Sequence, residues 1–168
     1  VMAVTCLVLP ATPPTGAGEA PILKALTMLR DTNFLVFMVV SLVVGGLMQF
    51  YFLGSARFMM DIGIPAKNVP ASMAMAQAVQ AAATFFLLGW LISGVGFKWT
   101  LAIGAACWLV LYVVYVISKS RLVVIVAQSL HGLAYVLFII AGQIYAGSVA
   151  SPEILKSMQA LVFVATTG

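Results

Sequence analysis

The sequence predicts an all-α fold, a polytopic bundle of membrane-spanning helices. Four stretches without Lys, Arg, Asp or Glu are 25, 30, 20 and 31 residues long, at 32–56, 68–97, 99–118 and 122–152. A helix needs about 20 predominantly apolar residues to cross a hydrocarbon core of about 30 Å. Each of the four stretches is long enough, so each predicts one span.

The composition supports the same class. Apolar residues make up 64% of the 168 residues and charged residues 7%, whereas soluble domains carry roughly 25% charged residues. The mean hydropathy is +1.17. The apolar runs are continuous, whereas strands of a membrane barrel alternate apolar and polar residues, so the spans are predicted to be helices. The net charge of +4 is dispersed around the ends of the spans and does not indicate a nucleic-acid partner.

The chain divides into three parts. Residues 1–9 are an apolar run too short for a span and are expected to end a truncated helix. Residues 10–31 hold clustered prolines and glycines and predict a linker, with a short helix over 22–29 after Pro21. Residues 32–168 predict the helix bundle. Its helices are expected at about 32–56, 70–93, 99–118 and 122–147, with a further truncated one from 152. Two short interfacial segments are the alternative for the terminal apolar runs.

Polar residues mark the boundaries between these helices. Any of residues 31–33 can cap the first span. The gap at 93–98 is short, which predicts an antiparallel pair of helices around it. Ser151, Pro152 and Glu153 favour a helix start, with a hydroxyl cap, a proline at the first position and an acid facing the helix dipole. Four Lys or Arg fall on each side of the membrane, so the positive-inside rule does not decide the orientation.

Polar side chains inside the spans are the natural site candidates, because they are costly in a membrane and often functional. Several share a helix face at spacings of three, four or seven residues: Gln77, Gln80 and Thr84 in the second span, and Gln128, His131 and Tyr135 in the fourth, where Gly142 continues the stripe. We expect a cavity for an uncharged, hydrogen-bonding solute, with five candidate residues: Gln49, Gln77, Gln80, Tyr135 and Gln143. The alternative is packing, in which such groups hydrogen-bond between helices for about 0.6 kcal/mol each.

His131 could relay protons, because the pKa of an imidazole lies near neutrality. No Asp or Glu lies in any predicted span to partner it. Its position near the predicted helix end favours an imidazole that reaches the interface instead. No span carries a carboxylate pair, a metal-ligating set or a nucleophile elbow, so we expect no enzyme, no cofactor and no metal. Cys6 and Cys107 lie in apolar runs and are given no chemistry.

The segment Gly89-Trp-Leu-Ile-Ser-Gly-Val-Gly96-Phe-Lys98 resembles the cytoplasmic signature loop of the major facilitator superfamily. That pattern usually has an acid and a base where Ser93 and Gly94 stand here. The resemblance implies a gating loop that includes Gly89, Gly96 and Lys98.

The fourth span resembles the tenth helix of the nucleoside:proton symporter branch of that superfamily. The matching residues are Leu130-His131-Gly132, Tyr135, Phe138, Gly142-Gln143 and Tyr145, followed by Ser151-Pro152-Glu153 and Ser157-Met-Gln159-Ala160. Pro10 to Pro14, Gln49-Phe-Tyr51 and Asn68 to Gln77 support it in the same order and spacing. The resemblance implies the end of helix six to the start of helix eleven of a twelve-helix transporter. It also implies a missing N-terminal half, a bacterial inner membrane and a cytoplasmic side for the 10–31 linker.

Three positions depart from that branch, whose relatives tend to carry an acid, a base and an acid in helices eight to ten. Gln80, Leu111 and Val136 stand at these positions, so proton coupling stays open. The resemblance implies secondary active transport of a small polar solute, nucleoside-like, in a lipid bilayer and with or without protons. A non-transporting receptor or sensor on a transporter scaffold, or a facilitator of another small metabolite, remains the alternative.

Overall fold

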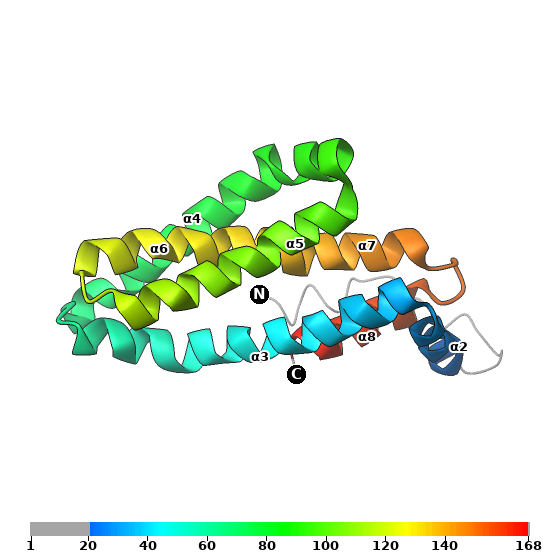
Figure 1. The fold of residues 1–168 in the computed structure, drawn as a ribbon, viewed down its shortest axis with the longest axis horizontal. Helices are drawn as coiled ribbons and strands as arrows, with labels where there is room; N and C mark the ends of the chain where they lie inside the picture. Colours follow the sequence, from blue (N-terminus) through cyan, green and yellow to red (C-terminus); the bar gives the residue numbers. More distant parts are fainter. Residues whose placement is uncertain (1–20, 168) are drawn as a thin grey trace, which may run out of the picture.

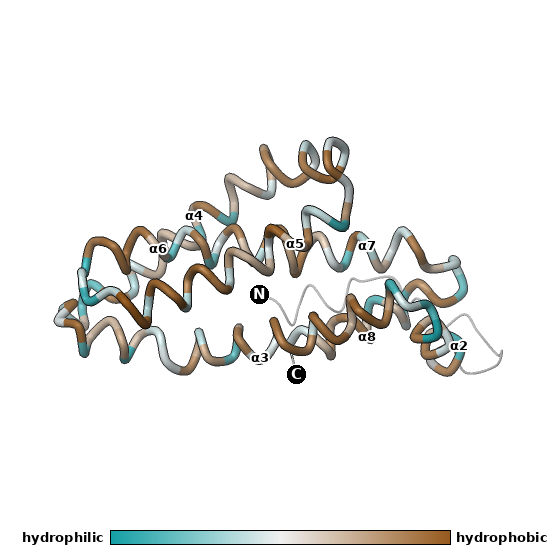
Figure 2. The backbone as a smooth tube through the Cα atoms, in the orientation of Figure 1, coloured by the Kyte–Doolittle hydropathy of each residue, from teal (hydrophilic) through white to brown (hydrophobic). Residues whose placement is uncertain are grey.

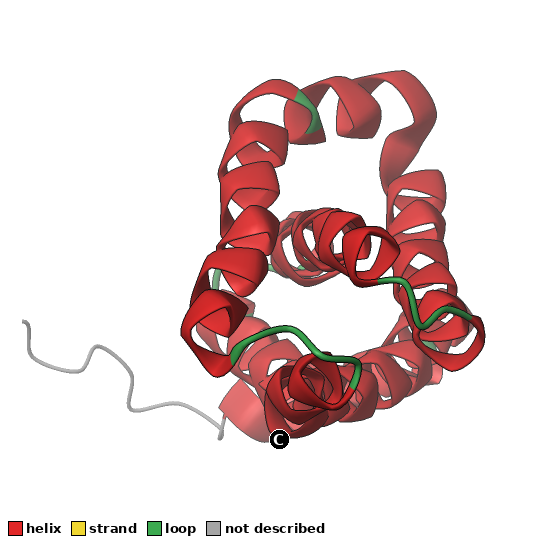
Figure 3. Ribbon diagram, turned by 90° about the vertical axis from the view of Figure 1, so that its left-hand side faces the viewer, coloured by secondary structure: helices red, strands yellow, loops and turns green. Residues whose placement is uncertain are grey.

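The computed structural model describes residues 21–167, and these residues are helical nearly throughout (Figures 1 and 3). No strand occurs among them, which confirms the all-α prediction. The predictions for residues 1–9, for Cys6 and for the first part of the 10–31 linker lie outside the described residues.

The helices follow one another with short connections. In chain order they are α2 (Pro21–Thr27), η1 (Met28–Arg30), α3 (Thr32–Asp61), η2 (Ala66–Asn68), α4 (Val69–Phe86), α5 (Leu88–Ile117), α6 (Arg121–Ala134), a π-helical segment (Tyr135–Ile140), α7 (Ala141–Val149) and α8 (Leu155–Thr167). The segment Tyr135–Ile140 is called the π turn below. The continuous rod formed by α6, the π turn and α7 lies at the centre, against α4, α5 and α8 (Figure 1). α3 packs mainly on α8.

Three helices are long and apolar enough to cross a membrane: Thr32–Asp61, Leu88–Ile117 and Arg121–Val149. The predicted span at 70–93 is divided at Leu87 between α4 and the start of α5. Gln77 and Gln80 lower the hydropathy of the 18-residue α4. Large apolar side chains cover the outside of the bundle: Leu53, Phe86 and Val116 are 83%, 83% and 84% exposed. Figure 2 shows apolar residues along α3 and α5, with polar ones at the turns between helices. Such surfaces fit lipid, and the chain is an integral membrane protein.

α3 begins at a side-chain cap and ends in a glycine turn. The Asp31 carboxylate accepts a hydrogen bond from the backbone N–H of Phe34 at 2.9 Å. At the other end Gly63 takes φ 91°, and the N–H of Ile64 donates to the carbonyl of Met59 at 2.9 Å, which is a Schellman motif. The helix runs five residues past the predicted 56, and Arg57 and Asp61 pair across its last turn.

A single residue, Gly96, separates the short first part of α5 from its long second part. Its φ of 78° and ψ of 171° are non-helical, whereas the residues on both sides are helical. The sequence predicts a boundary over 93–98, and the structure has the change of direction there. Gly89 lies in the first part, while Lys98 lies just beyond the break, with its ammonium 6.0 Å from the ring of Trp99. A cavity of about 570 Å³ between α3, α5 and the π turn includes Lys98.

We expect Gly96→Ala to lower the free energy of unfolding by about 1–3 kcal/mol, because this backbone region is essentially restricted to glycine. No atom lies within 4 Å of an added Cβ, so backbone strain alone sets the cost. The measurement is the thermal midpoint of the full-length protein in detergent. Gly94→Ala is the control, since Gly94 is helical and equally open. A midpoint for Gly96→Ala at or above that control would contradict the break.

α8 begins at Leu155, three residues after the predicted start at 152. The preceding acid makes a tertiary contact instead of facing the helix: the Lys24 ammonium donates a hydrogen bond to the Glu153 carboxylate. This bond holds the pKa of the Glu153 carboxyl below its usual range. It ties α2 to the connection between α7 and α8.

Candidate functional site

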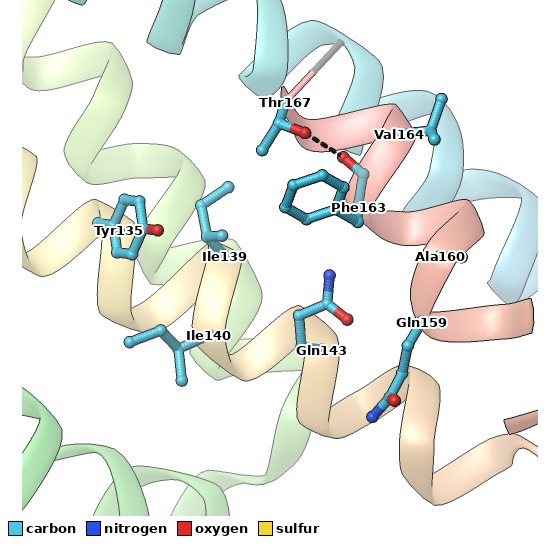
Figure 4. Close-up of a pocket in the computed structure, with 9 residues that line it drawn as sticks. All are labelled: Tyr135, Ile139, Ile140, Gln143, Gln159, Ala160, Phe163, Val164 and Thr167. Atoms are coloured by element: carbon cyan, nitrogen blue, oxygen red, sulfur yellow. Dashed lines mark hydrogen bonds between the residues drawn. The ribbon is translucent and has the colours of Figure 1, made fainter. Parts of the chain in front are cut away.

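A cavity of about 620 Å³ lies between α8 and the helix formed by the π turn and α7 (Figure 4). We call it the α7–α8 cavity. Its lining residues are Tyr135, Ile139, Ile140, Gln143, Gln159, Ala160, Phe163, Val164 and Thr167.

The polar groups of this cavity are neutral. The phenol of Tyr135 and the carboxamides of Gln143 and Gln159 provide donors and acceptors, and the ring of Phe163 is 59% exposed. No charged side chain stands among the described residues that line it. The Thr167 hydroxyl donates its hydrogen bond within its own helix, to the Phe163 carbonyl at 2.7 Å. The arrangement suits an uncharged, flat solute with its own hydrogen-bonding groups, and a charged solute would find no counter-ion here.

The five predicted cavity residues are distributed over two regions. Tyr135 and Gln143 line the α7–α8 cavity together. Gln49 of α3 does not line it, although its carboxamide donates to the carbonyl of the lining residue Thr167 at 2.8 Å. Gln77 and Gln80 lie on α4 and do not line this cavity; Gln77 is exposed, and Gln80 is half-buried. No bound solute tests these assignments, so the set of five stays a prediction.

The π turn changes which residue follows Tyr135 on the cavity face. A 3.6-residue period predicts that Gly142 continues the stripe of Gln128, His131 and Tyr135. In the structure Gly142 is buried, and a Cβ built on it would lie 3.0 Å from the ring of Phe37, away from the cavity. Gln143 takes the cavity position instead (Figure 4). Gly142 lies on the buried side that faces α3, as Gln128 and His131 do.

His131 is buried in the bundle, at 1% exposure, and does not reach the interface. Its ring stacks on that of Tyr51, with centroids 3.7 Å apart and planes 6° apart, and it meets Trp108 edge-on at 4.9 Å. The expectation of an interfacial imidazole was wrong, because the helix continues through the π turn to Val149 and leaves His131 well inside it. Among the described residues its Nδ1 has no hydrogen-bond partner. The proton-relay role stays a prediction.

A buried hydrogen-bonded network lies beside His131 and joins three helices. The Tyr51 hydroxyl of α3 donates to Oε1 of Gln128 in α6 at 2.8 Å. Nε2 of Gln128 donates to the hydroxyl of Tyr115 in α5 at 2.8 Å and to the Val124 carbonyl at 2.9 Å. Tyr115 in turn donates to Ser55 at 3.3 Å. Gln128 is fully buried with these partners, so it serves packing and is closed to a solute.

The three positions at which the resemblance implies charged side chains hold neutral residues in different settings. Leu111 and Val136 are fully buried in apolar clusters. Gln80 lies at the contact of α4 with α6: a Cβ on Gly132 would stand 3.0 Å from the Gln80 backbone nitrogen. In the part of the chain described here, these positions supply no ionisable group to the bundle.

Sequence reasoning missed the α8 side of the cavity. Gln159, Phe163 and Thr167 recur at intervals of four residues, the spacing of one helix face. That spacing is visible in the sequence, although the predicted cavity takes no residue from this truncated helix. No group of three or more His, Cys, Asp or Glu that could hold a metal occurs in residues 21–167.

Comparison with known proteins gives one relative and one family. The chain is 25% identical over 180 residues to the "Putative nucleoside transporter YegT" of Escherichia coli (strain K12), and all of the chain but 41% of that protein is covered. The chain therefore spans about two fifths of the length of this relative. No solved structure matches the chain. The sequence profile described as "Nucleoside H+ symporter" matches residues 1–168. The chain belongs to the nucleoside H+ symporter family.

Proposed function

We propose that the chain is part of a secondary active transporter that moves a nucleoside-like solute across the membrane by alternating access. The family and the name of the E. coli relative support a nucleoside-type transporter. Transporters of this kind bind the solute near the middle of the bilayer, between parts that rock against one another. We assign the chain to the C-terminal half of a major facilitator superfamily protein, on the resemblance over 89–98 and 130–160.

The lining of the α7–α8 cavity is the observation that carries the solute class. A nucleoside is uncharged, with a planar base and several donors and acceptors. The carboxamides of Gln143 and Gln159 can pair with a base edge, as Gln does with adenine. The exposed ring of Phe163 offers a stacking face, and base stacking on an aromatic ring contributes about 1–3 kcal/mol. The described residues that line this subsite hold no cation to neutralise a phosphate, which favours a nucleoside over a nucleotide.

Proton coupling belongs to the proposal as a separate step. Gln80, Leu111 and Val136 carry no charge, so a coupling group would come from the rest of the protein. By the same resemblance the linker, the 89–98 segment and the α7–α8 connection face the cytoplasm, and the membrane is the inner membrane of a bacterium.

The test is uptake of labelled uridine by the full-length protein, in cells that lack their own nucleoside uptake. Concentrative uptake that a protonophore abolishes supports symport, and uptake that only follows the gradient supports a uniporter. No saturable uptake of any nucleoside would contradict the proposal. Saturable binding without uptake would favour a receptor on a transporter scaffold, which the neutral residues at Gln80, Leu111 and Val136 suggest as the second candidate.

Substitutions of the cavity residues test whether the solute binds there. We expect Tyr135→Phe and Gln143→Leu each to raise the KM for uridine up to about tenfold, the loss of one hydrogen bond. Gln77→Leu makes the same chemical change on the exposed face of α4 and reports whether the site extends to that helix. Unchanged KM values in Tyr135→Phe and Gln143→Leu would remove the α7–α8 cavity as the solute site.

A further inference from the structure

The π turn interrupts one long helix at the cavity. In a π-helix each N–H bonds to the carbonyl five residues earlier instead of four, so the turn holds one extra residue. Each residue of an α-helix turns the chain by about 100°. Residues after a single π turn are therefore rotated by about 100° from where a straight α-helix would put them.

This rotation accounts for the composition of the cavity wall. In a straight α-helix Tyr135 and Gln143, eight residues apart, would point about 80° apart. One extra residue in the turn reduces that angle to about 20°. Tyr135 and Gln143 do line the same cavity, while Phe138 and Gly142 lie on the other side, near Phe37.

A glycine on α5 admits the backbone of the π turn. A Cβ built on Gly104 would lie 2.7 Å from the carbonyl carbon of Leu137 and 2.7 Å from the nitrogen of Phe138. Both atoms are backbone, so a side chain at Gly104 could be accommodated only if the helices moved. Gly104 is buried, and α5 and the π turn are in direct contact there.

We propose that the π turn is the positioning element of the solute site, and that Gly104 is its positioning residue. The extra residue turns Gln143, and not Gly142, to the face of Tyr135, and Gly104 lets the π turn rest against α5. The inference relies on the proposed function for the identity of the solute, while the helix register can be tested without it.

The first experiment reads the register by cysteine chemistry in the full-length protein, with its native cysteines, Cys6 and Cys107 among them, replaced by alanine. Gly142→Cys and Gln143→Cys are treated with a small water-soluble thiol reagent, with and without saturating uridine. Cysteine at 143 is expected to react and to be protected by uridine, whereas cysteine at 142, which a straight α-helix would turn to the face of Tyr135, is not protected. Protection at 142 and none at 143 would overturn the proposal.

Length variants of the turn decide between a π turn and a straight helix. Deleting Ile140 removes the extra residue, so the turn becomes α-helical and Gln143→Cys keeps its protection. Inserting one alanine after Ile140 turns position 143 by about 100° and abolishes protection. Loss of protection on the deletion would mean that the helix is straight, and it would overturn the proposal. If the parent protein neither takes up uridine nor is protected by it, the proposed function fails. Reactivity at 143 in the deletion and insertion variants then still reports the register.

Gly104→Ala tests the positioning residue. We expect it to raise the KM for uridine about tenfold, a value that does not depend on the amount of folded protein in the membrane, because it acts through Gln143. In the Gln143→Leu background the same substitution should change KM little. Gly94→Ala is the control, since an added Cβ there meets no atom within 4 Å. A full, independent effect of Gly104→Ala in both backgrounds would show a merely structural glycine.

Discussion

Gly45→Ala is expected to lower the free energy of unfolding by about 1–3 kcal/mol, whereas Gly46→Ala, one residue further on, is not. A Cβ on Gly45 would lie 2.7 Å from the Ala165 carbonyl oxygen and 2.9 Å from that of Thr166. These are backbone atoms of α8, so the two helices would have to separate, and overpacking of this kind typically costs about 1–3 kcal/mol. Close approach through small residues is a common way for membrane helices to associate.

Gly46 is a control matched in helix, depth and chemistry. Nothing lies within 4 Å of a Cβ built there, and alanine is favoured over glycine in a helix by about 1 kcal/mol. The thermal midpoints of both variants, measured on the full-length protein in one detergent, should therefore move in opposite directions. Equal midpoints for the two variants would contradict the contact between α3 and α8.

The membrane-helix class follows from the sequence because it depends on the absence of charge over long stretches. The end of α3 does not follow from that criterion. Arg57 and Asp61 lie beyond the apolar stretch, yet they are helical and pair with each other at 3.0 Å across the last turn before the glycine turn at Gly63. Charge content alone cannot distinguish a paired helical turn from a loop.

The residue types in the sequence indicate the solute-site candidates, but they do not indicate which of the candidates share a face of the helix. Tyr135 and Gln143 are polar residues in an apolar helix, which the sequence displays. That they share a face depends on the π turn, and the π turn lies against Gly104, far away in sequence. A periodicity argument assumes one helical repeat throughout, so a tertiary contact that changes the repeat is invisible to it.

The burial of His131 has a similar origin. Its neighbours Tyr51 and Trp108 come from α3 and α5, and no local pattern around His131 indicates them. The distance of a residue from the nearest charged residue indicates its position along its own helix. Its burial depends instead on which other helices pack around that position.

Gln128→Leu is expected to have a further large effect on stability, about 1–3 kcal/mol, because it leaves a buried donor without a partner. Leucine keeps the approximate volume of the side chain and removes both the acceptor oxygen and the donor nitrogen of the carboxamide. The Tyr51 hydroxyl then loses the acceptor that it holds at 2.8 Å, in a site where Tyr51 is 2% exposed. Tyr115 keeps its bond to Ser55, so most of the cost falls on Tyr51.

A double-mutant cycle isolates that cost. Tyr51→Phe preserves the ring that stacks on His131 and removes only the hydroxyl. In Gln128→Leu the phenylalanine removes the orphaned donor, so the double variant should be more stable than the sum of the two single effects predicts. We expect a coupling energy of about 0.5–3 kcal/mol, from thermal or denaturant unfolding of the full-length protein in detergent. Strict additivity would mean that the hydroxyl finds another partner when Gln128 is lost, and that the network does not join α3 to α6.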